Sequence, residues 1–286
     1  MAAGRATSEQ GGGGAAVGSS SATGSLGAVG GQSSQPGAPN GSSTNSAQPH
    51  DSSSPSKPGQ SSASGGAPST GGGNQPTSAP PPGAQHPAYA GRLASGAAQS
   101  SSASATLRTS AASPGSGSLL LSVMLTNTHS GAVGASDSAG NSYSVIADQS
   151  DGAGDRTLIL AAVGAKSLAA GGSVTVTFPT SSEHHAALDA FSGVSAITGH
   201  SSATAASGPF ASGAASASGG GIVFAAAGIQ GGENATWSAG FTALPTLLVA
   251  PADQLATAYE SAGSGSAQGS GSCNHQWMAA VVTLAG

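Results

Sequence analysis

The sequence predicts an all-β protein in which a two-sheet antiparallel β-sandwich, residues 113–286, follows a long disordered Gly/Ser/Pro-rich segment, residues 1–112. Three observations lead to this prediction. The composition changes sharply near Ser113, short apolar runs separated by turn residues fill the second stretch, and no segment sustains an apolar stripe of helical period. A second stretch of this length is expected to form one domain.

The first stretch, residues 1–112, has almost nothing to pack. It contains none of the chain's five Phe, two Trp or single Cys, and Tyr89 is its only tyrosine. A segment of this composition buries too little apolar surface to offset the entropy cost of ordering its backbone, which is about 1–2 kcal/mol per residue. We therefore expect disorder and interpret the segment as a flexible spacer, with drift of a low-complexity sequence as the alternative.

The second stretch, residues 113–286, holds all five Phe and both Trp. A domain of this size can bury roughly 70% of the surface that its unfolded chain exposes. Its apolar runs are 5–11 residues long and are bounded by Gly, Pro, Asn, Asp or Ser, which is typical of strands. The predicted strands are 118–127, 143–148, 156–165, 173–179, 184–194, 221–229, 235–239, 241–249, 254–261 and 275–285.

Two of these runs carry more specific signals. In residues 173–178, three apolar side chains alternate with Ser and Thr, which is the period of two expected for a half-buried strand. The run 277–284 is instead apolar on both alternating faces. A solvent-facing edge strand would not have this pattern, so the run predicts an interior strand.

The stretch VGASDSAGNSYSVIADQS, residues 133–150, predicts a hairpin with its turn at 138–141. Gly140 and Asn141 tolerate the positive φ that a tight connection requires. Asp137 and Ser138 can accept hydrogen bonds from the amides of the turn. We interpret the stretch as local folding information.

Charge is divided between the two stretches. Residues 1–112 carry four basic and two acidic residues, whereas residues 113–286 carry two basic and nine acidic residues. An acidic domain lacks the basic surface that nucleic acid binding requires and has little attraction for anionic lipid. No apolar run approaches the ~18 residues of a membrane span. We therefore expect no nucleic acid partner and no membrane span.

Two further features bear on the compartment. Cys273 is the only cysteine, so no intrachain disulfide can form. The N-terminal residues MAAGRATSEQGGGG contain no apolar run of roughly 7–15 residues, so no signal peptide is visible.

The motifs SDSAGNSYSVIAD, RTLILAAV, GGSVTVTF, ALDAFSGV, GIVFAAAG, ATWSAGFTALP, LATAYE and WMAAVVTL follow one another along the chain. This succession, over about residues 118–286, resembles a family of bacterial secreted or cell-surface modules. The resemblance implies a jelly-roll-like β-sandwich at an extracellular or cell-surface location. It brings no catalytic residues with it.

The loop DQSDGAGD places Asp148, Asp151 and Asp155 close together on a glycine-containing segment. Closely spaced carboxylates on such a loop suit Ca²⁺, which takes oxygen ligands. The spacing does not match an EF-hand, and a solvated turn is the alternative interpretation. The three residues are the candidate metal ligands of this sequence.

The segment EHHAALD offers Glu183, His184, His185 and Asp189. Adjacent histidines on a strand point to opposite faces, so they cannot share one metal ion. We interpret both histidines as surface residues that open a strand.

Cys273 and His275 are two residues apart and could form a nucleophile pair, but catalytic Cys and His residues are normally distant in sequence. We interpret Cys273 as a small half-buried residue. Trp237 and Trp277 are interpreted as core residues, with ligand stacking as the alternative.

We therefore expect a non-catalytic extracellular or cell-surface module with a binding, adhesive or structural role, a glycan or another surface component as partner, and no cofactor. One alternative is a fibre or capsid-like jelly roll of a phage or virion. Another is a glycoside hydrolase, which needs two carboxylates about 5–10 Å apart. Glu183, Glu233 and Glu260 are the available glutamates, and no short motif pairs them.

Overall fold

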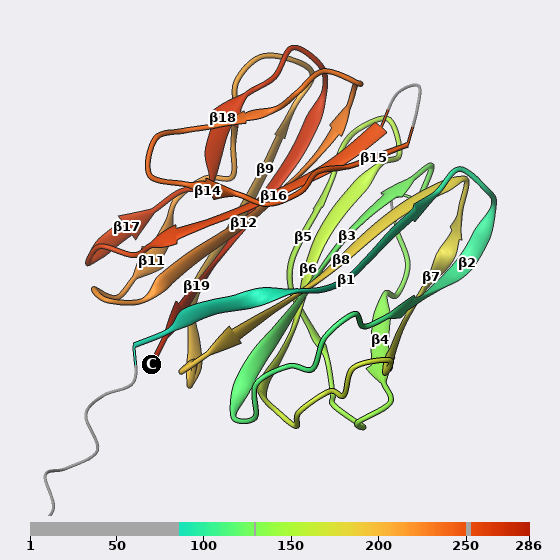
Figure 1. The fold of residues 1–286 in the computed structure, drawn as a ribbon. Helices are drawn as coiled ribbons and strands as arrows, with labels where there is room; N and C mark the ends of the chain where they lie inside the picture. Colours follow the sequence, from blue (N-terminus) through green and yellow to red (C-terminus); the bar gives the residue numbers. More distant parts are fainter. Residues whose placement is uncertain (1–85, 129, 250–252) are drawn as a thin grey trace, which may run out of the picture. The chain divides into compact units, whose positions relative to one another are not determined.

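The computed structural model describes residues 86–128, 130–249 and 253–286. Every regular element in these ranges is a β-strand, and all strand pairs are antiparallel (Figure 1). The all-β prediction is therefore confirmed. The disorder predicted for residues 1–85 lies outside the described residues. The same ranges contain no helix long and apolar enough to cross a membrane.

Two large sheets form the centre of the fold (Figure 1). The strands of the five-stranded sheet are, in spatial order, β1 (Ala88–Ala98), β8 (Glu183–Ser192), β3 (Gly117–Thr126), β6 (Arg156–Ala165) and β5 (Ser144–Ser150). Those of the six-stranded sheet are β14 (Thr242–Ala243), β16 (Asp253–Ser261), β12 (Ile222–Gln230), β19 (Trp277–Ala285) and β9 (Ala196–Ala205), with β15 (Leu247–Val249) also paired to β16.

Three smaller sheets complete the described residues. Their strands are β2 (Ser102–Arg108), β7 (Ser173–Ser181) and β4 (Gly134–Asp137) in the first; β10 (Phe210–Ala211), β18 (Ser270–Ser272) and β13 (Thr236–Trp237) in the second; and β11 (Ala215–Ala217) and β17 (Gly265–Ala267) in the third.

The small sheets cover the outer faces of the large ones. Between the large sheets, Met124 and Phe191 of the five-stranded sheet belong to one core with Phe224 and Met278 of the six-stranded sheet. The outer face of the five-stranded sheet packs against β2 and β7, and the outer face of the six-stranded sheet packs against residues of β10 and β11. Both large sheets are thus buried on both faces, which is why strands such as β19 are apolar throughout.

The interior position of β19 confirms the prediction made from its sequence. It lies between β12 and β9, and its residues Met278 to Leu284 are all at most 2% exposed.

The boundary of the ordered region corrects the sequence prediction. The domain was expected to begin at residue 113, but β1 and β2 lie in residues 88–108. β1 pairs with β8 from Ala88 to Ala98, and Leu93 and Ala94 are buried. Because alanine and glycine let β1 pack closely with few large side chains, a criterion based on large apolar residues does not detect it.

The hairpin predicted in residues 133–150 is reduced to a single antiparallel bridge, between Ser136 and Ser142. β4 pairs with β7 and β5 pairs with β6, so the turn at 138–141 carries the chain from a small sheet to a large one. The turn contacts expected for Asp137 are present: its Oδ1 accepts hydrogen bonds from the amides of Ala139 and Asn141, both at 3.0 Å, and Gly140 has a φ of 74°. Ser138 Oγ instead accepts from the amide of Ser173 at 3.1 Å, outside the turn.

Gly228 marks a close approach of the two large sheets and gives a testable prediction. A Cβ atom at Gly228 would lie 2.2 Å from Thr157 Oγ1 and 3.0 Å from Met124 Sδ. We expect Gly228→Ala to lower the free energy of unfolding by about 1–3 kcal/mol, because the well-packed core must shift. Urea unfolding measures the change, with Gly115→Ala as the control because, apart from its two chain neighbours, no described residue places an atom within 4 Å of the added Cβ. Equal midpoints for the two variants would show that the sheets are not tightly packed here.

Candidate functional site

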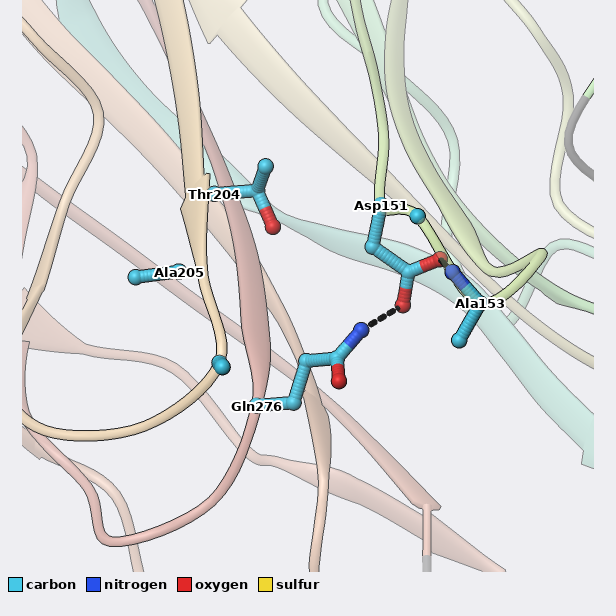
Figure 2. A pocket seen from close by; sticks show the side chains of 7 residues that line it. Asp151, Ala153, Thr204, Ala205 and Gln276 are labelled. Atoms are coloured by element: carbon cyan, nitrogen blue, oxygen red, sulfur yellow. Dashed lines mark hydrogen bonds between the residues drawn. The ribbon is translucent and has the colours of Figure 1, made fainter. Parts of the chain in front are cut away.

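A pocket of about 320 Å³ opens where the edges of the two large sheets meet (Figure 2). One side is the β5–β6 turn, with Asp151, Gly152 and Ala153. The other side is formed by Thr204, Ala205 and Ala206 at the end of β9, together with Gln276 before β19. We call this the Asp151 pocket.

The side chain of Asp151 organises the β5–β6 turn. Its Oδ1 atom accepts hydrogen bonds from the amides of Ala153, Gly154 and Asp155 at 2.8, 2.7 and 2.8 Å. Gly154 has a φ of 119°, a conformation that suits glycine. These contacts fix the turn in one shape without a ligand.

The same carboxylate also binds the opposite sheet. Asp151 Oδ2 accepts a hydrogen bond from Gln230 Nε2 at 3.0 Å and another from Gln276 Nε2. Gln230 ends β12 and Gln276 precedes β19, so both bonds join the five-stranded sheet to the six-stranded one. The Asp151 pocket is therefore held together by contacts across the sandwich.

Two residues with polar side chains, Thr204 and Gln276, line the pocket together with Asp151. Figure 2 shows the Gln276 amide turned with its nitrogen toward Asp151, which leaves its carbonyl oxygen directed elsewhere. Thr204 Oγ1 donates to the carbonyl oxygen of Trp277 at 2.6 Å and retains its capacity to accept. Alanines 153, 205 and 206 supply small apolar surface beside these groups.

Two of the three candidate calcium ligands come together, because Asp151 and Asp155 both accept from Gln230 Nε2, whereas Asp148 pairs with Arg156. Asp148 accepts from Arg156 Nε and Nη2 at 2.7 and 2.5 Å, and Asp155 accepts from the amide of Asn127 at 2.9 Å and from Gln230. With Asp151 occupied as described, all three carboxylates already have protein donors. No group of three or more His, Cys, Asp or Glu residues in the described part of the chain could hold a metal ion. Calcium binding by Asp148, Asp151 and Asp155 stays a prediction, and these contacts do not favour it.

The two histidines of EHHAALD are buried, which corrects their expected place on the surface. β8 lies between β1 and β3, so both of its faces are covered. His184 packs against Phe178 of β7, with ring centroids 5.4 Å apart, whereas His185 Nε2 lies 3.2 Å from the carbonyl oxygen of Asp253 in the six-stranded sheet. They point to opposite faces, as expected. Burial lowers the pKa of His185 to about 4.

Cys273 and His275 do not form a nucleophile pair. Cys273 Sγ donates to the carbonyl oxygen of Gly208 at 3.1 Å, and burial raises the pKa of the thiol. His275 Nδ1 instead lies 2.6 Å from Glu233 Oε2. Cys273 was expected to be half-buried and is buried in the structure.

The two tryptophans belong to apolar clusters. Trp237 packs against Phe210 and Phe241, with ring centroids 4.9 and 5.4 Å away, and Trp277 is 5% exposed. Their interpretation as core residues agrees with this packing.

A buried ion pair is absent from the sequence prediction. Arg92 Nε and Nη2 donate to the two oxygens of Asp189, both at 3.0 Å, and Tyr89 Oη donates to the same carboxylate at 3.0 Å. Arg92 also reaches Thr257 and the carbonyl oxygen of Pro245, so it links β1 to the strands near β16. Sequence reasoning missed the pair because it placed Arg92 in the disordered segment. An arginine close to Tyr89 and Leu93 in an otherwise Gly/Ala-rich run was the available signal.

Comparison with known proteins adds no relatives: no family model, no curated protein and no solved structure matches this chain.

Proposed function

We propose that this chain is a non-catalytic extracellular or cell-surface binding module that holds a hydroxyl-rich ligand, such as a sugar unit of a surface glycan, in the Asp151 pocket. Residues 1–85 would serve as the spacer that presents the module. The observation that carries the proposal is the set of oxygen-bearing side chains, Asp151, Thr204 and Gln276, that gathers at the pocket from three separate segments.

The chemistry of the lining matches a hydroxyl-rich ligand. Sugar hydroxyl groups both donate and accept hydrogen bonds, and the carbonyl oxygen of Gln276 and the hydroxyl oxygen of Thr204 can accept from them. The alanines provide apolar contact for the C–H groups of the ring. Among the described lining residues Asp151 alone is charged, so the pocket does not favour an anion. Its volume of about 320 Å³ is at the lower end of the range for ligand pockets and suits one sugar unit.

A binding role fits the state of Asp151 better than a catalytic role. Its carboxylate accepts three backbone amides and two glutamine side chains, so its oxygens are committed to holding the site together. A general base must instead be within reach of a substrate proton. We therefore assign Asp151 the role of organising the pocket.

A glycan array probed with the full chain tests the proposal. We expect binding to a restricted set of glycans, and a loss of about tenfold in affinity in Gln276→Ala and in Thr204→Val, because each removes one hydrogen-bonding group. The matched controls are Gln268→Ala and Thr242→Val, whose side chains are exposed and lie outside the lining. Absence of glycan binding, or equal binding by all four variants, would contradict the proposal.

A further inference from the structure

Three buried carboxylates lie between the large sheets beside the β5–β6 turn. Asp155, Glu183 and Asp253 are 4%, 5% and 8% exposed. Asp155 ends the turn, Glu183 begins β8, and Asp253 begins β16 in the opposite sheet. Thr126 Oγ1 donates to Asp253 Oδ2 at 3.0 Å, which ties β3 to β16 at this point. We call these three residues the buried carboxylate cluster.

No described cation neutralises this cluster. Arg156 follows Asp155 in the chain, but its guanidinium binds Asp148 and the carbonyl oxygen of Gly131. His185 Nε2 lies 3.5 Å from Glu183 Oε1, yet burial keeps the imidazole neutral near pH 7. Glu183 Oε1 has no hydrogen-bond partner within the described ranges.

The electrostatic surroundings of Glu183 favour its protonated form. Burial, and then the charges of Asp253 and Asp155, raise the pKa of Glu183 to about 7, against an opposing hydrogen bond with Gln99. Burial also raises the pKa values of Asp155 and Asp253, and Asp151 adds its charge beside Asp155. His184 points to the other face of β8, and His129 lies outside the described residues.

A chain of hydrogen bonds connects this cluster to the Asp151 pocket. Gln230 Nε2 donates to Asp155 Oδ2 and to Asp151 Oδ2, and Gln276 Nε2 donates to the same Asp151 oxygen. Each of these bonds crosses from the five-stranded to the six-stranded sheet. Repulsion within the cluster would push the two large sheets apart. It would therefore weaken the hydrogen bonds of Gln230 and Gln276 that hold the pocket together.

From this geometry we infer that the Asp151 pocket is under pH control: loss of the Glu183 proton adds a negative charge to the buried carboxylate cluster and loosens the pocket. The effect of pH on ligand affinity rests on the proposed function. The loosening of the pocket does not, because it occurs in the chain without ligand. Ligand binding is then tighter in mildly acidic than in mildly alkaline surroundings.

The direction of the pH effect follows from proton linkage. Glu183 has a pKa of about 7 in the closed state and an ordinary value of 4.5 when the site opens. The closed state therefore holds an extra proton between these values, and its stability falls as the pH rises from 4.5 through 7. His185, with its pKa lowered from 6.5 to about 4, acts in the opposite direction below pH 6.5. The contribution of His185 is the same in the wild type and in a variant of Glu183, so it cancels when the two are compared at the same pH.

Amide hydrogen exchange of the full chain without ligand tests the inference. The amides of Ala153, Gly154 and Asp155 report the opening of the turn, because they donate to Asp151. We expect these amides to exchange more slowly in Glu183→Gln than in the wild type. The protection factor of the variant divided by that of the wild type should rise by about tenfold or more between pH 5 and pH 7.5. Glu260→Gln, the same change on β16 outside the cluster, should give a ratio that does not vary with pH.

Asp253→Asn is the second variant. It tests the inference if Glu183→Gln does not fold. Removal of one neighbouring charge lowers the pKa of Glu183, so this variant should also protect the turn more than the wild type does at pH 7.5. Ratios that stay constant with pH would overturn the inference, even if the glycan array shows binding. A blank glycan array would contradict the proposed function alone, because the exchange measurement uses no ligand.

Discussion

A chain shortened to residues 113–286 is expected not to fold, whereas a chain that begins at His86 is expected to unfold like the full chain. The shorter chain lacks β1 and β2, and with them Leu93 and Leu107, which are 2% and 6% exposed. Burial of each leucine is worth about 1.5–3 kcal/mol. The shorter chain also leaves Asp189 buried without Arg92, at a further cost of about 3–5 kcal/mol. Together these losses are comparable to the net stability of about 5–15 kcal/mol that is typical of a folded protein.

Urea unfolding followed by tryptophan fluorescence distinguishes the two chains. The chain of residues 86–286 should show a cooperative transition with the midpoint of the full chain, and the chain of residues 113–286 should be insoluble or show none. A cooperative transition in the shorter chain would mean that β1 and β2 only rest on a domain that is complete without them.

Arg92→Ala is expected to lower the free energy of unfolding by about 3–5 kcal/mol. Asp189 is fully buried, and Arg92 supplies both of its charge-assisted hydrogen bonds. Without the guanidinium, Tyr89 Oη is the one remaining donor to the carboxylate among the described residues, so Asp189 must remain charged in an apolar environment or take up a proton. Arg108→Ala is the control, since this exposed arginine makes one long contact of 3.4 Å to the carbonyl oxygen of Gly171; it should change stability by less than about 0.5 kcal/mol.

The deficit of Arg92→Ala should also depend on pH. Burial already raises the pKa of Asp189 in the presence of Arg92, and loss of the cation raises it further. A carboxyl group with a raised pKa in the folded state loses stability as the pH rises through that pKa. The deficit relative to the wild type should therefore be smaller at pH 4 than at pH 7. An equal deficit at both values would show that the loss comes from packing of the arginine stem.

The parts of the fold that the sequence predicts well are those where side-chain periodicity alone decides the structure. β7 shows the alternation of a half-buried strand, and β19 has the uniform apolar character of an interior strand. β1 could not be found in this way, because its burial depends on the close fit of Ala and Gly against β8. The same dependence on a partner explains why the histidines of β8 were expected on the surface: the strands that cover them are not visible in their own segment.

The candidate site likewise contains residues that the sequence singles out and residues that it does not. Asp151 stands out in the sequence because a carboxylate in a glycine-containing loop is a local signal. The loop predicts calcium binding or a solvated turn, and in the structure the Asp151 oxygens accept hydrogen bonds from backbone amides and glutamines. Thr204 and Gln276 reach the pocket only through the pairing of β9 with β19, where Trp277 lies opposite Ala205. No local pattern in the sequence predicts that β9 and β19 pair.

The side-chain amide of Gln276 reports on ligand binding in the Asp151 pocket, because it lines the pocket and donates to Asp151. Nuclear magnetic resonance can follow this amide while the full chain is titrated with the glycan that binds best on the array. We predict a saturable shift of the Gln276 side-chain signal, accompanied by the backbone amides of Ala153 and Gly154, while the exposed Gln268 signal stays in place. Saturable binding that moves signals elsewhere and leaves Gln276, Ala153 and Gly154 unchanged would show that the ligand does not bind in the Asp151 pocket.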